Sequence, residues 1–466
     1  MRHGVLASPS AAFKDAGLVA ATTVAFGVLA VLSLYASLQH PALVVISLVV
    51  PLCLAAALVL ALACAGNVWA MVVFFVVLVF FNDGYFRARA AGEAGLDWQN
   101  GAKFVLWTGA IAIGVTHFNR IRGLLTGPVL PLIGAYFLFA LISALYSPSP
   151  LFSFATAWGM LAMLLFALAV VATLSERQIL VSFAVTLWIF VLVGWAVFFA
   201  VPELGRSPFI TNAGVVDRIC GIAGQANALG RVLALFLALV FLLWYRGHWS
   251  ALATLPFAVT GFVTLLAADS RSSLLALIFS IAAVIARRSM WLLGVSLLGL
   301  LATFLLLQLI PLREILQSLS GVSRSGDPTE VFTLTGRTEL WEFAWSKVLL
   351  SPWLGYGYNS GKFVLPQFLG LGISVEGAHN MWLENLLSVG FIGTLPLAGA
   401  FALMALDYLR APLPMRDIFL FLVLIYGMTE SATFGTVPSV LTFAIFIGVA
   451  MNARRTEQRP GNGGRS

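Results

Sequence analysis

Residues 179–201 read ILVSFAVTLWIFVLVGWAVFFAV and contain no charged side chain. A helix of about 20 apolar residues crosses the ~30 Å hydrocarbon layer of a membrane with all of its backbone hydrogen bonds satisfied internally. Comparable runs recur along nearly the whole chain. We therefore predict an all-α, polytopic integral membrane protein, with about 12–14 transmembrane helices and one long non-cytoplasmic loop that itself contains helices.

The composition agrees with this class. Of the 466 residues, 61% are apolar and 10% are charged, and the mean hydropathy is +0.99. Soluble domains have about 45–50% apolar and about 25% charged residues, so a water-soluble core is excluded. The three cysteines form no CxxC pair, which argues against a disulfide framework or a zinc site. A net charge of +7 in a membrane chain does not predict nucleic-acid binding.

The hydropathy pattern contains a series of candidate spans, the first of which we read as uncleaved. The hairpin 42–81 has a short second limb, so either limb is also compatible with a re-entrant segment. The candidate spans are 17–37, 42–64, 67–81, 103–118, 124–146, 152–174, 179–201, 228–245, 250–268, 271–286, 290–311, 382–405, 414–430 and 437–453.

Lysine and arginine near span ends favour the cytoplasm. With both termini inside, fourteen of the 26 basic residues are cytoplasmic, eleven lie on the other side, and Arg231 lies within a span. So many outer basic residues suggest an anionic ligand among them. The chain then divides into transmembrane helices at 1–311, an outer loop with part of the active site at 312–381, transmembrane helices at 382–453, and a disordered cytoplasmic tail at 454–466.

The long loop predicts one helix, from about Thr335 to Leu350, with Pro352 marking its end. Thr335 or Thr338 can cap it, and Arg337 falls in its first turn. An anion bound there would meet both the guanidinium and the free backbone N–H groups, although Arg337 is equally compatible with an ordinary exposed residue. Trp341, four residues before Trp345, suits either a membrane interface or stacking on a sugar.

A second polar group stands at the start of the span 382–405, in the sequence EGAHNMWLENL from residue 376. His379 is the side chain best suited to take a proton near neutral pH, because its unperturbed pKa is ~6.5. We expect His379 to begin the helix, and Asn380 and Glu384 to share one face at its outer mouth. A lone histidine at a membrane surface is also often only an interfacial polar residue.

Other charged residues lie at span ends on the same side. Arg271 begins the span 271–286 and is costly there unless it is paired or faces a wet cavity, with Asp269 as a local partner. Glu430, at the outer end of the span 414–430, is costly there for the same reason. Arg218 and Asn227 precede the span 228–245, and Arg231 is expected to face the same cavity.

Several reaction types lose support because their motifs are missing. The sequence has no DxD pair at the site, no HExxH, no Walker loop and no GxSxG, so we expect no metal and no cofactor. Arginines can replace a metal at a diphosphate, because charge-assisted bidentate hydrogen bonds neutralise a leaving group as its charge grows.

At these residues the sequence resembles the O-antigen ligase and polymerase family of integral-membrane glycosyltransferases. The matching positions follow the family's order over about 210 residues around its long outer loop. They are Arg218 with Gly221 and Asn227, Ser270-Arg271-Ser272, Gly336-Arg337 with Trp341 and Gly355-Tyr356-Gly357, and His379-Asn380 with Leu383, Glu384 and Gly390.

The resemblance implies transfer of a glycan from a polyprenyl diphosphate carrier at the periplasmic face of the bacterial inner membrane, without metal or nucleotide sugar. The spacing resembles the O-antigen ligases, in which an acid, commonly aspartate, occupies the position of Glu430. The implied donor is undecaprenyl diphosphate-linked O-antigen, and the implied acceptor is a lipid A core hydroxyl. The implied catalytic residues are His379, Arg337 and Arg271, and the implied binding residues are Arg218, Asn227, Asn380, Glu384, Glu430 and Trp341.

Three other functions remain open. An O-antigen polymerase and a protein O-oligosaccharyltransferase belong to the same family. A transporter or lipid flippase also has many spans, but it predicts inverted repeats and broken helices near the membrane midplane, which the sequence does not show clearly.

Overall fold

The computed structural model describes residues 44–86, 97–211, 214–287, 337–367, 377–431 and 433–457. Apart from one two-stranded hairpin, the described elements are helices, so the predicted all-α polytopic class is confirmed. The chain divides into two compact units, Met1–Phe74 and Phe75–Ser466. The predicted spans 17–37 and 290–311 lie outside the described residues.

Helix α2 (Val44–Cys64) lies in the first unit and ends at a tight turn that leads into α3 (Val68–Asp83), whose residues from Phe75 onward belong to the second unit. Gly66 in this turn has a left-handed φ of 88°, which glycine adopts without steric cost. The Asn67 side chain accepts the Ala70 N–H at 3.0 Å and so caps the start of α3. The turn therefore falls between the predicted spans 42–64 and 67–81.

The second unit contains the remaining helices, and each predicted span that falls within its described residues overlaps one of them. Before the hairpin these are α4 (Trp98–Thr116), α5 (Phe118–Ile121), α6 (Val129–Ile142), α7 (Pro150–Thr173), α8 (Glu176–Ala200) and α9 (Pro202–Gly205). After it come α10 (Ala226–Tyr245), α11 (Ala251–Ala267), α12 (Arg271–Ala286), α16 (Arg337–Leu350), α17 (Gly361–Val364), α18 (Met381–Arg410), α19 (Pro414–Gly427) and α20 (Val440–Glu457). Short 3₁₀ turns join some of these, at Arg122–Thr126, Ser143–Tyr146, Gly221–Ala223 and Leu365–Gln367.

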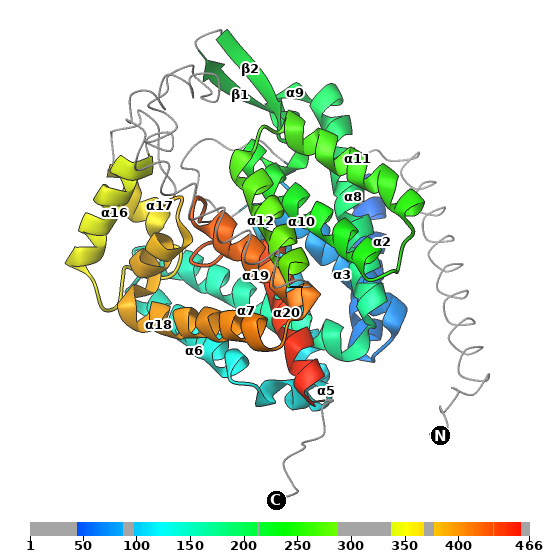
Figure 1. Ribbon diagram of the computed structural model, residues 1–466, viewed down its shortest axis with the longest axis horizontal. Helices are drawn as coiled ribbons and strands as arrows, with labels where there is room; N and C mark the ends of the chain where they lie inside the picture. The colour runs from blue at the N-terminus through cyan, green and yellow to red at the C-terminus, as the bar shows by residue number, and fades with distance from the viewer. Residues whose placement is uncertain are drawn as a thin grey trace, which may run out of the picture. The chain divides into compact units, whose positions relative to one another are not determined.

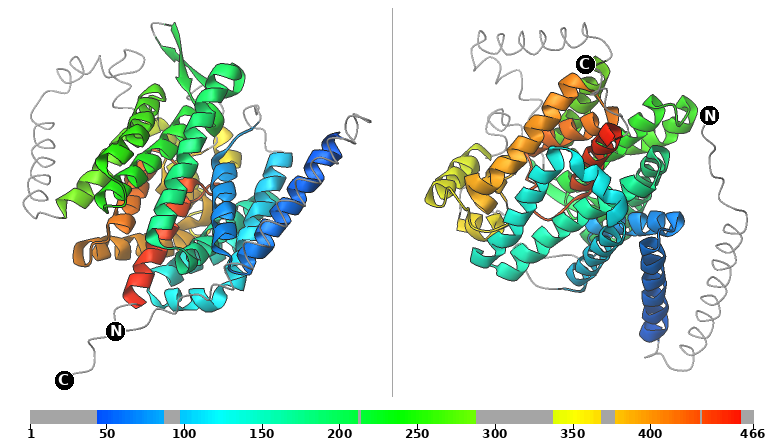
Figure 2. Two further views of the ribbon diagram at one scale, coloured as in Figure 1. Left: turned by 90° about the vertical axis from the view of Figure 1, so that its right-hand side faces the viewer. Right: turned by 90° about the horizontal axis from the view of Figure 1, so that it is seen from below.

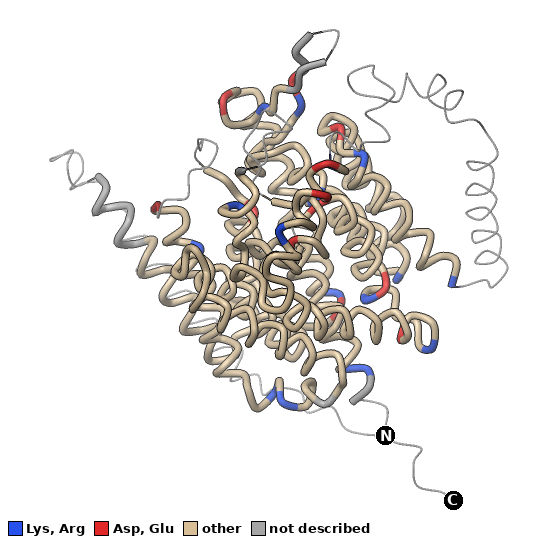
Figure 3. Tube along the Cα trace, turned by 90° about the vertical axis from the view of Figure 1, so that its left-hand side faces the viewer, with Lys and Arg blue, Asp and Glu red and all other residues tan. Residues whose placement is uncertain are grey.

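Among the described helices, five are long and apolar enough to cross a membrane, or six if the pair Trp98–Thr116 and Phe118–Leu125, bent by 68°, counts as one span. Four shorter apolar helices, of 10–17 residues, accompany them. Figure 3 shows long tan stretches of helix, with much of the charge toward helix ends and connecting turns. This distribution is typical of a multi-pass membrane protein.

The core of the second unit forms around α10. Leucine, alanine, valine and phenylalanine occur on every side of α10, and a helix that is apolar all round is stable only when neighbours cover it. Helices α8, α11, α12 and α19 pack against it, and α18 packs beside α6, as Figures 1 and 2 show. This packing brings the start of α10 close to the end of α19.

The connection between α9 and α10 contains the hairpin, β1 (Arg206–Thr211) with β2 (Gly214–Ile219), paired antiparallel. The prediction had only a loop here, because six-residue strands are too short to stand out beside long apolar runs. The hairpin positions the site, since Arg218 lies at the end of β2 and α10 begins shortly after it.

Helix α18 is broken at Gly390, whose φ of 61° and ψ of −169° are not helical. The glycine-rich aromatic turn at residues 354–359, with the two residues before it, supplies partners for the backbone groups that the break leaves unpaired. Four hydrogen bonds join them: Tyr356 N–H to Leu387 C=O (2.7 Å), Gly357 N–H to Ser388 C=O (2.9 Å), Phe391 N–H to Pro352 C=O (2.8 Å) and Ile392 N–H to Trp353 C=O (3.2 Å). The predicted span 382–405 lies within α18, and the break at Gly390 is a feature that the sequence did not reveal, because a single glycine also fits a straight helix.

Substituting Gly390 by alanine is expected to destabilise the protein by about 1–3 kcal/mol, because a non-glycine residue would have to keep a left-handed φ. Its Cβ would also collide with the Trp353 backbone. Gly399→Ala is the matched control on the same helix, where the nearest atom to a new Cβ is Leu132 Cδ1 at 3.4 Å. Denaturant unfolding in detergent measures both; equal stabilities for the two variants would contradict the role assigned to the break.

Candidate functional site

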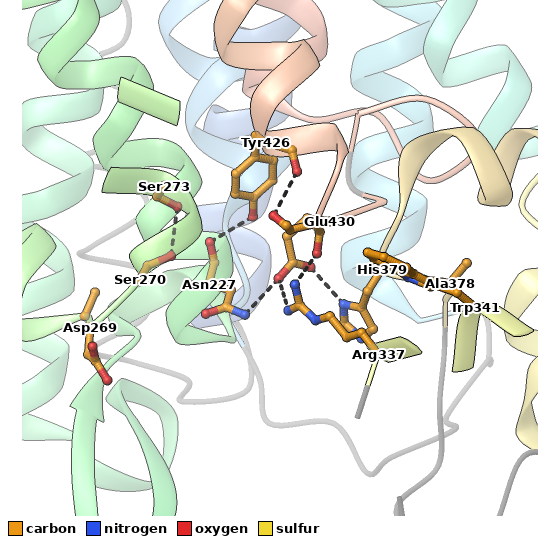
Figure 4. A network of polar contacts seen from close by, with 12 residues as sticks. Asn227, Asp269, Ser270, Ser273, Arg337, Trp341, Ala378, His379, Tyr426 and Glu430 are labelled. Carbon is orange, nitrogen blue, oxygen red and sulfur yellow. Dashed lines mark hydrogen bonds and ion pairs between the residues drawn. The ribbon is translucent and has the colours of Figure 1, made fainter. Parts of the chain in front are cut away.

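Five segments far apart in the sequence bring polar side chains into one region (Figure 4). The start of α10 supplies Asn227, the start of α16 supplies Arg337, and the residues just before α18 supply His379. The residues after α19 supply Glu430, and the turn between α11 and α12 supplies Asp269. The structure thus brings together most of the residues singled out in the sequence.

Glu430 is the centre of this group. Its carboxylate accepts hydrogen bonds from Arg337 Nη2 at 2.7 Å, from His379 Nδ1 at 2.9 Å and from Asn227 Nδ2 at 2.9 Å (Figure 4). Only 8% of the side chain is exposed. The Glu430 N–H bonds back to Tyr426 C=O at 2.9 Å, so the end of α19 holds the carboxylate in place.

The charge state of Glu430 follows from these contacts. Burial alone would raise the pKa of its carboxyl group, but hydrogen bonds and opposite charges from His379 and Arg337 outweigh burial and lower the pKa to about 2. The group is therefore an anion at any physiological pH. An ionised carboxylate only accepts hydrogen bonds, so the His379 Nδ1 facing it carries a proton.

His379 lies just before helix α18 rather than within it, which corrects the prediction. Its φ of 46° is left-handed, a conformation that costs a non-glycine residue of order 1–3 kcal/mol and persists where neighbours fix it. Two of them hold the preceding residue: Trp341 Nε1 donates to Ala378 C=O at 2.9 Å, and the Glu384 carboxylate accepts the Ala378 N–H at 2.7 Å. The His379 side chain remains 39% exposed.

Asn380 is the N-cap of α18. Its Oδ1 accepts the N–H groups of Trp382 at 3.0 Å and Leu383 at 3.2 Å, and its Nδ2 donates to Met428 C=O at 3.2 Å. These contacts satisfy the first turn of the helix and join it to the end of α19. Asn380 thus connects the histidine segment to the segment that carries Glu430.

Glu384 is fully buried instead of facing the outer mouth, so that expectation is wrong. Gly361 and Gly377 make room for the carboxylate: a Cβ on Gly377 would come within 3.3 Å of Glu384 Oε2, and one on Gly361 would collide with the same side chain. With its bond to Ala378, the buried carboxylate supports the backbone that presents His379.

Arg337 begins α16, as predicted, and α16 ends at Leu350, just before Pro352. Thr338 lies inside the helix, so it is not the N-cap, while Thr335 lies outside the described residues. The guanidinium donates to Thr429 C=O as well as to Glu430, and 16% of the side chain is exposed. These two contacts tie the start of α16 to the end of α19.

Arg218 and Asn227 extend the group toward the α11–α12 turn. Arg218 donates to Ala268 C=O at 2.7 Å, to Asp269 C=O at 3.0 Å and to Asn227 Oδ1 at 3.1 Å. Tyr426 Oη donates to Asn227 C=O at 3.1 Å. Arg218 is therefore buried and holds backbone, which indicates a positioning role alongside the predicted binding role.

Arg271 is less closely connected than the other predicted residues. It begins α12, its side chain is 45% exposed, and its Nε lies 3.9 Å from Asp269 Oδ1. The structure connects it to the Glu430 group through Asp269, whose carbonyl Arg218 holds. Arg271 thus lies at the exposed rim of the site.

Arg231, which the sequence placed at the same cavity, pairs with a second buried carboxylate rather than with Glu430. It forms an ion pair of 2.8 Å with Asp83, at the end of α3, and both side chains are buried. Asp83 also accepts the Val440 N–H at 2.7 Å, so the pair joins α3, α10 and α20. Asp83 was missed in the sequence because it directly follows the apolar run 67–81 and looks like the ordinary end of a span.

Among the described residues, no group of three or more histidine, cysteine, aspartate or glutamate side chains is arranged to hold a metal ion. The described site instead offers guanidinium groups, one imidazole and the buried carboxylate of Glu430. Such a set can bind an anion and move a proton, which are the requirements of a displacement at a phosphorylated carbon.

One family model matches a part of the chain. Residues 256–398 match the family model described as O-antigen ligase, so the resemblance found in the sequence is confirmed. The matched segment contains Asp269, Arg271, Arg337, Trp341, His379, Asn380 and Glu384, while Arg218, Asn227 and Glu430 lie outside it. No curated protein matches the chain.

Proposed function

We propose, from the match of residues 256–398 to the O-antigen ligase family, that this multi-pass membrane protein is an O-antigen ligase. It transfers the glycan from undecaprenyl diphosphate to a hydroxyl of the lipid A core oligosaccharide, at the periplasmic face of the bacterial inner membrane. Both termini are then cytoplasmic. The observation that carries the proposal is the contact of Glu430 with both His379 and Arg337.

The histidine and the carboxylate together form a general base. Because Glu430 holds Nδ1–H, the Nε2 atom of His379 has the free lone pair, and the imidazole is partly exposed. Nε2 takes the proton of the acceptor hydroxyl as its oxygen attacks the anomeric carbon, and the bond from that carbon to the diphosphate oxygen breaks. Attack from the face opposite the leaving group inverts the anomeric carbon. The Glu430 anion stabilises the imidazolium that forms.

The arginines hold the diphosphate and its growing charge. Arg337 donates one hydrogen bond to Thr429 C=O and one to the Glu430 carboxylate. A guanidinium has five N–H groups, so it can also donate to a phosphate oxygen. Arg337 also stands at the start of α16, and the N-terminus of a helix favours an anion. Arg271 at the rim adds a second cation, and Arg218 fixes the turn that presents it. No metal or cofactor is needed for this step.

One experiment separates the members of the family. In a strain lacking the gene, a ligase defect removes all O-antigen-capped lipid A core and leaves lipid-linked donor to accumulate, and we expect this pattern in extracted lipopolysaccharide. A polymerase defect retains core capped with a single repeat, and a protein O-oligosaccharyltransferase defect leaves capped core unchanged. Purified protein with defined donor and rough lipopolysaccharide should show transfer in the presence of a chelator.

A transporter or flippase remains the alternative of another class, and the break in α18 is a feature it would share. At this break, however, the segment 352–357 occupies the freed backbone groups, so they do not line an ion site. A flippase would move lipid-linked glycan between leaflets of a vesicle without forming a glycosidic bond. Translocation without transfer in the purified system would therefore overturn the ligase proposal.

A further inference from the structure

One face of α16 lines a shallow pocket beside His379. Its residues are Thr338, Trp341, Glu342 and Trp345 from α16, with Leu383 from α18, and its volume is about 410 Å³. This is within the range of ~300–1,000 Å³ typical of small-ligand sites. The catalytic step described above uses none of these side chains, so it does not explain the pocket.

The aromatic rings of the pocket are held in fixed positions. The indole N–H of Trp341 is bonded to Ala378 C=O, which leaves its ring faces for contact with a ligand. The opposite side of α16 is anchored in a core that includes Leu340, Ala344 and Val348. The Trp345 ring packs at 87° against the Phe391 ring, with centroids 6.4 Å apart, and Trp345 is nevertheless 42% exposed.

This combination of groups suits a carbohydrate. A sugar ring has apolar C–H faces that stack on an indole, and hydroxyl groups that need hydrogen-bond partners. The exposed Glu342 carboxylate accepts such bonds, and the Thr338 hydroxyl both donates and accepts them. Fixed aromatic rings also reduce the entropy that a ligand loses on binding.

The position of the pocket indicates whether it binds the donor or the acceptor saccharide. In Figure 4, Arg337 and Glu430 lie between the Asp269 turn on one side and Ala378 with Trp341 on the other. The rim arginine and the Arg218 contacts are on the first side, where the donor diphosphate is proposed to bind. The pocket is on the second side, next to the histidine that receives the acceptor proton.

We infer that the pocket lined by Thr338, Trp341, Glu342, Trp345 and Leu383 binds the acceptor saccharide, by stacking its rings on the two tryptophans. The inference rests on the proposed function, because that function supplies an acceptor sugar. It makes Trp341 and Trp345 specificity-determining residues for the acceptor, separate from the arginines that hold the donor.

The test measures binding of a lipid-free core oligosaccharide to the full-length protein in detergent, without donor, so that no turnover is needed. We expect Trp345→Ala to weaken this binding about tenfold or more, and Glu342→Gln to weaken it in the same direction. Trp353→Ala is the matched control, since Trp353 is 65% exposed, also packs on Phe391, and does not line the pocket. Thermal melting of each variant checks that it is folded.

The kinetic readout is a rise in the acceptor KM with an unchanged donor KM. Equal core binding by Trp345→Ala and wild type would overturn the pocket assignment and leave the ligase proposal intact. A loss of donor binding alone in Trp345→Ala would also overturn the pocket assignment. Quenching of Trp345 by lipid-borne quenchers, with no effect of the substitution on sugar binding, would overturn it too and would identify Trp345 as a membrane anchor. If the wild type binds only O-antigen repeat saccharide, the ligase proposal fails, and the effect of Trp345→Ala on that binding still decides the pocket.

Discussion

Replacing His379 by asparagine is expected to lower the rate of glycan transfer about 10²–10⁴-fold, the usual contribution of a general base. Asparagine tolerates a left-handed φ better than most residues, so the strained backbone at this position is retained. Its amide can still reach Glu430, but it cannot take a proton near neutral pH. The variant therefore removes proton transfer with little change to the segment.

The comparison that completes this test is His379→Ala, which removes the side chain and also disfavours the left-handed backbone. We expect both variants to be expressed and to accumulate lipid-linked donor. His248→Asn is the control, because His248 lies in the turn between α10 and α11, where its N–H bonds to Leu243 C=O of α10. Transfer at the wild-type rate by His379→Asn would mean that the histidine is a binding group and that another residue accepts the proton.

The sequence predicted those features of the fold that depend on local patterns. Apolar runs gave the approximate positions of the described helices, and Pro352 gave the end of α16 to within two residues. Positive charge at the start of a predicted helix singled out Arg271 and Arg337. These signals are readable because hydropathy and helix termination act within a few residues of the chain.

The features that the sequence did not predict depend on contacts between distant segments. Glu430 lies 51 residues from His379 and 93 from Arg337, and no local pattern shows that one carboxylate binds both. The pairing of Asp83 with Arg231 spans 148 residues. The burial of Glu384 follows from the glycines around it rather than from its own helix.

The break in α18 shows how such contacts alter even a helix. Gly390 and Pro396 are both compatible with a continuous transmembrane helix. Docking of the segment 352–357 stabilises the broken conformation, because that segment supplies the missing hydrogen bonds. The same segment follows α16, so the break also helps to place the loop that carries Arg337.

Substituting Glu430 by glutamine is expected to lower transfer about 10²–10⁴-fold, because the neutral amide cannot stabilise the imidazolium of His379. Glutamine has the same shape and can still accept a hydrogen bond from Arg337, so the loss measures charge more than packing. Glu430→Asp keeps the charge on a shorter side chain and should retain part of the activity. This control has added meaning because the O-antigen ligases that the sequence resembles commonly have aspartate here.

The same substitution should change how stability depends on pH. The pKa of Glu430 is lowered from 4.5 to about 2 by folding, so its stabilising contribution is fully present above pH 4.5 and is lost as the pH falls toward 2. Wild type should therefore exceed Glu430→Gln in melting temperature at pH 7, and the difference should shrink between pH 4.5 and 2. A pH-independent difference would show that Glu430 acts through packing alone.

Because Glu430 and His379 act as one unit, the double variant with His379→Asn should transfer no more slowly than the slower single variant. Multiplied losses in the double variant would instead separate the two residues into independent roles.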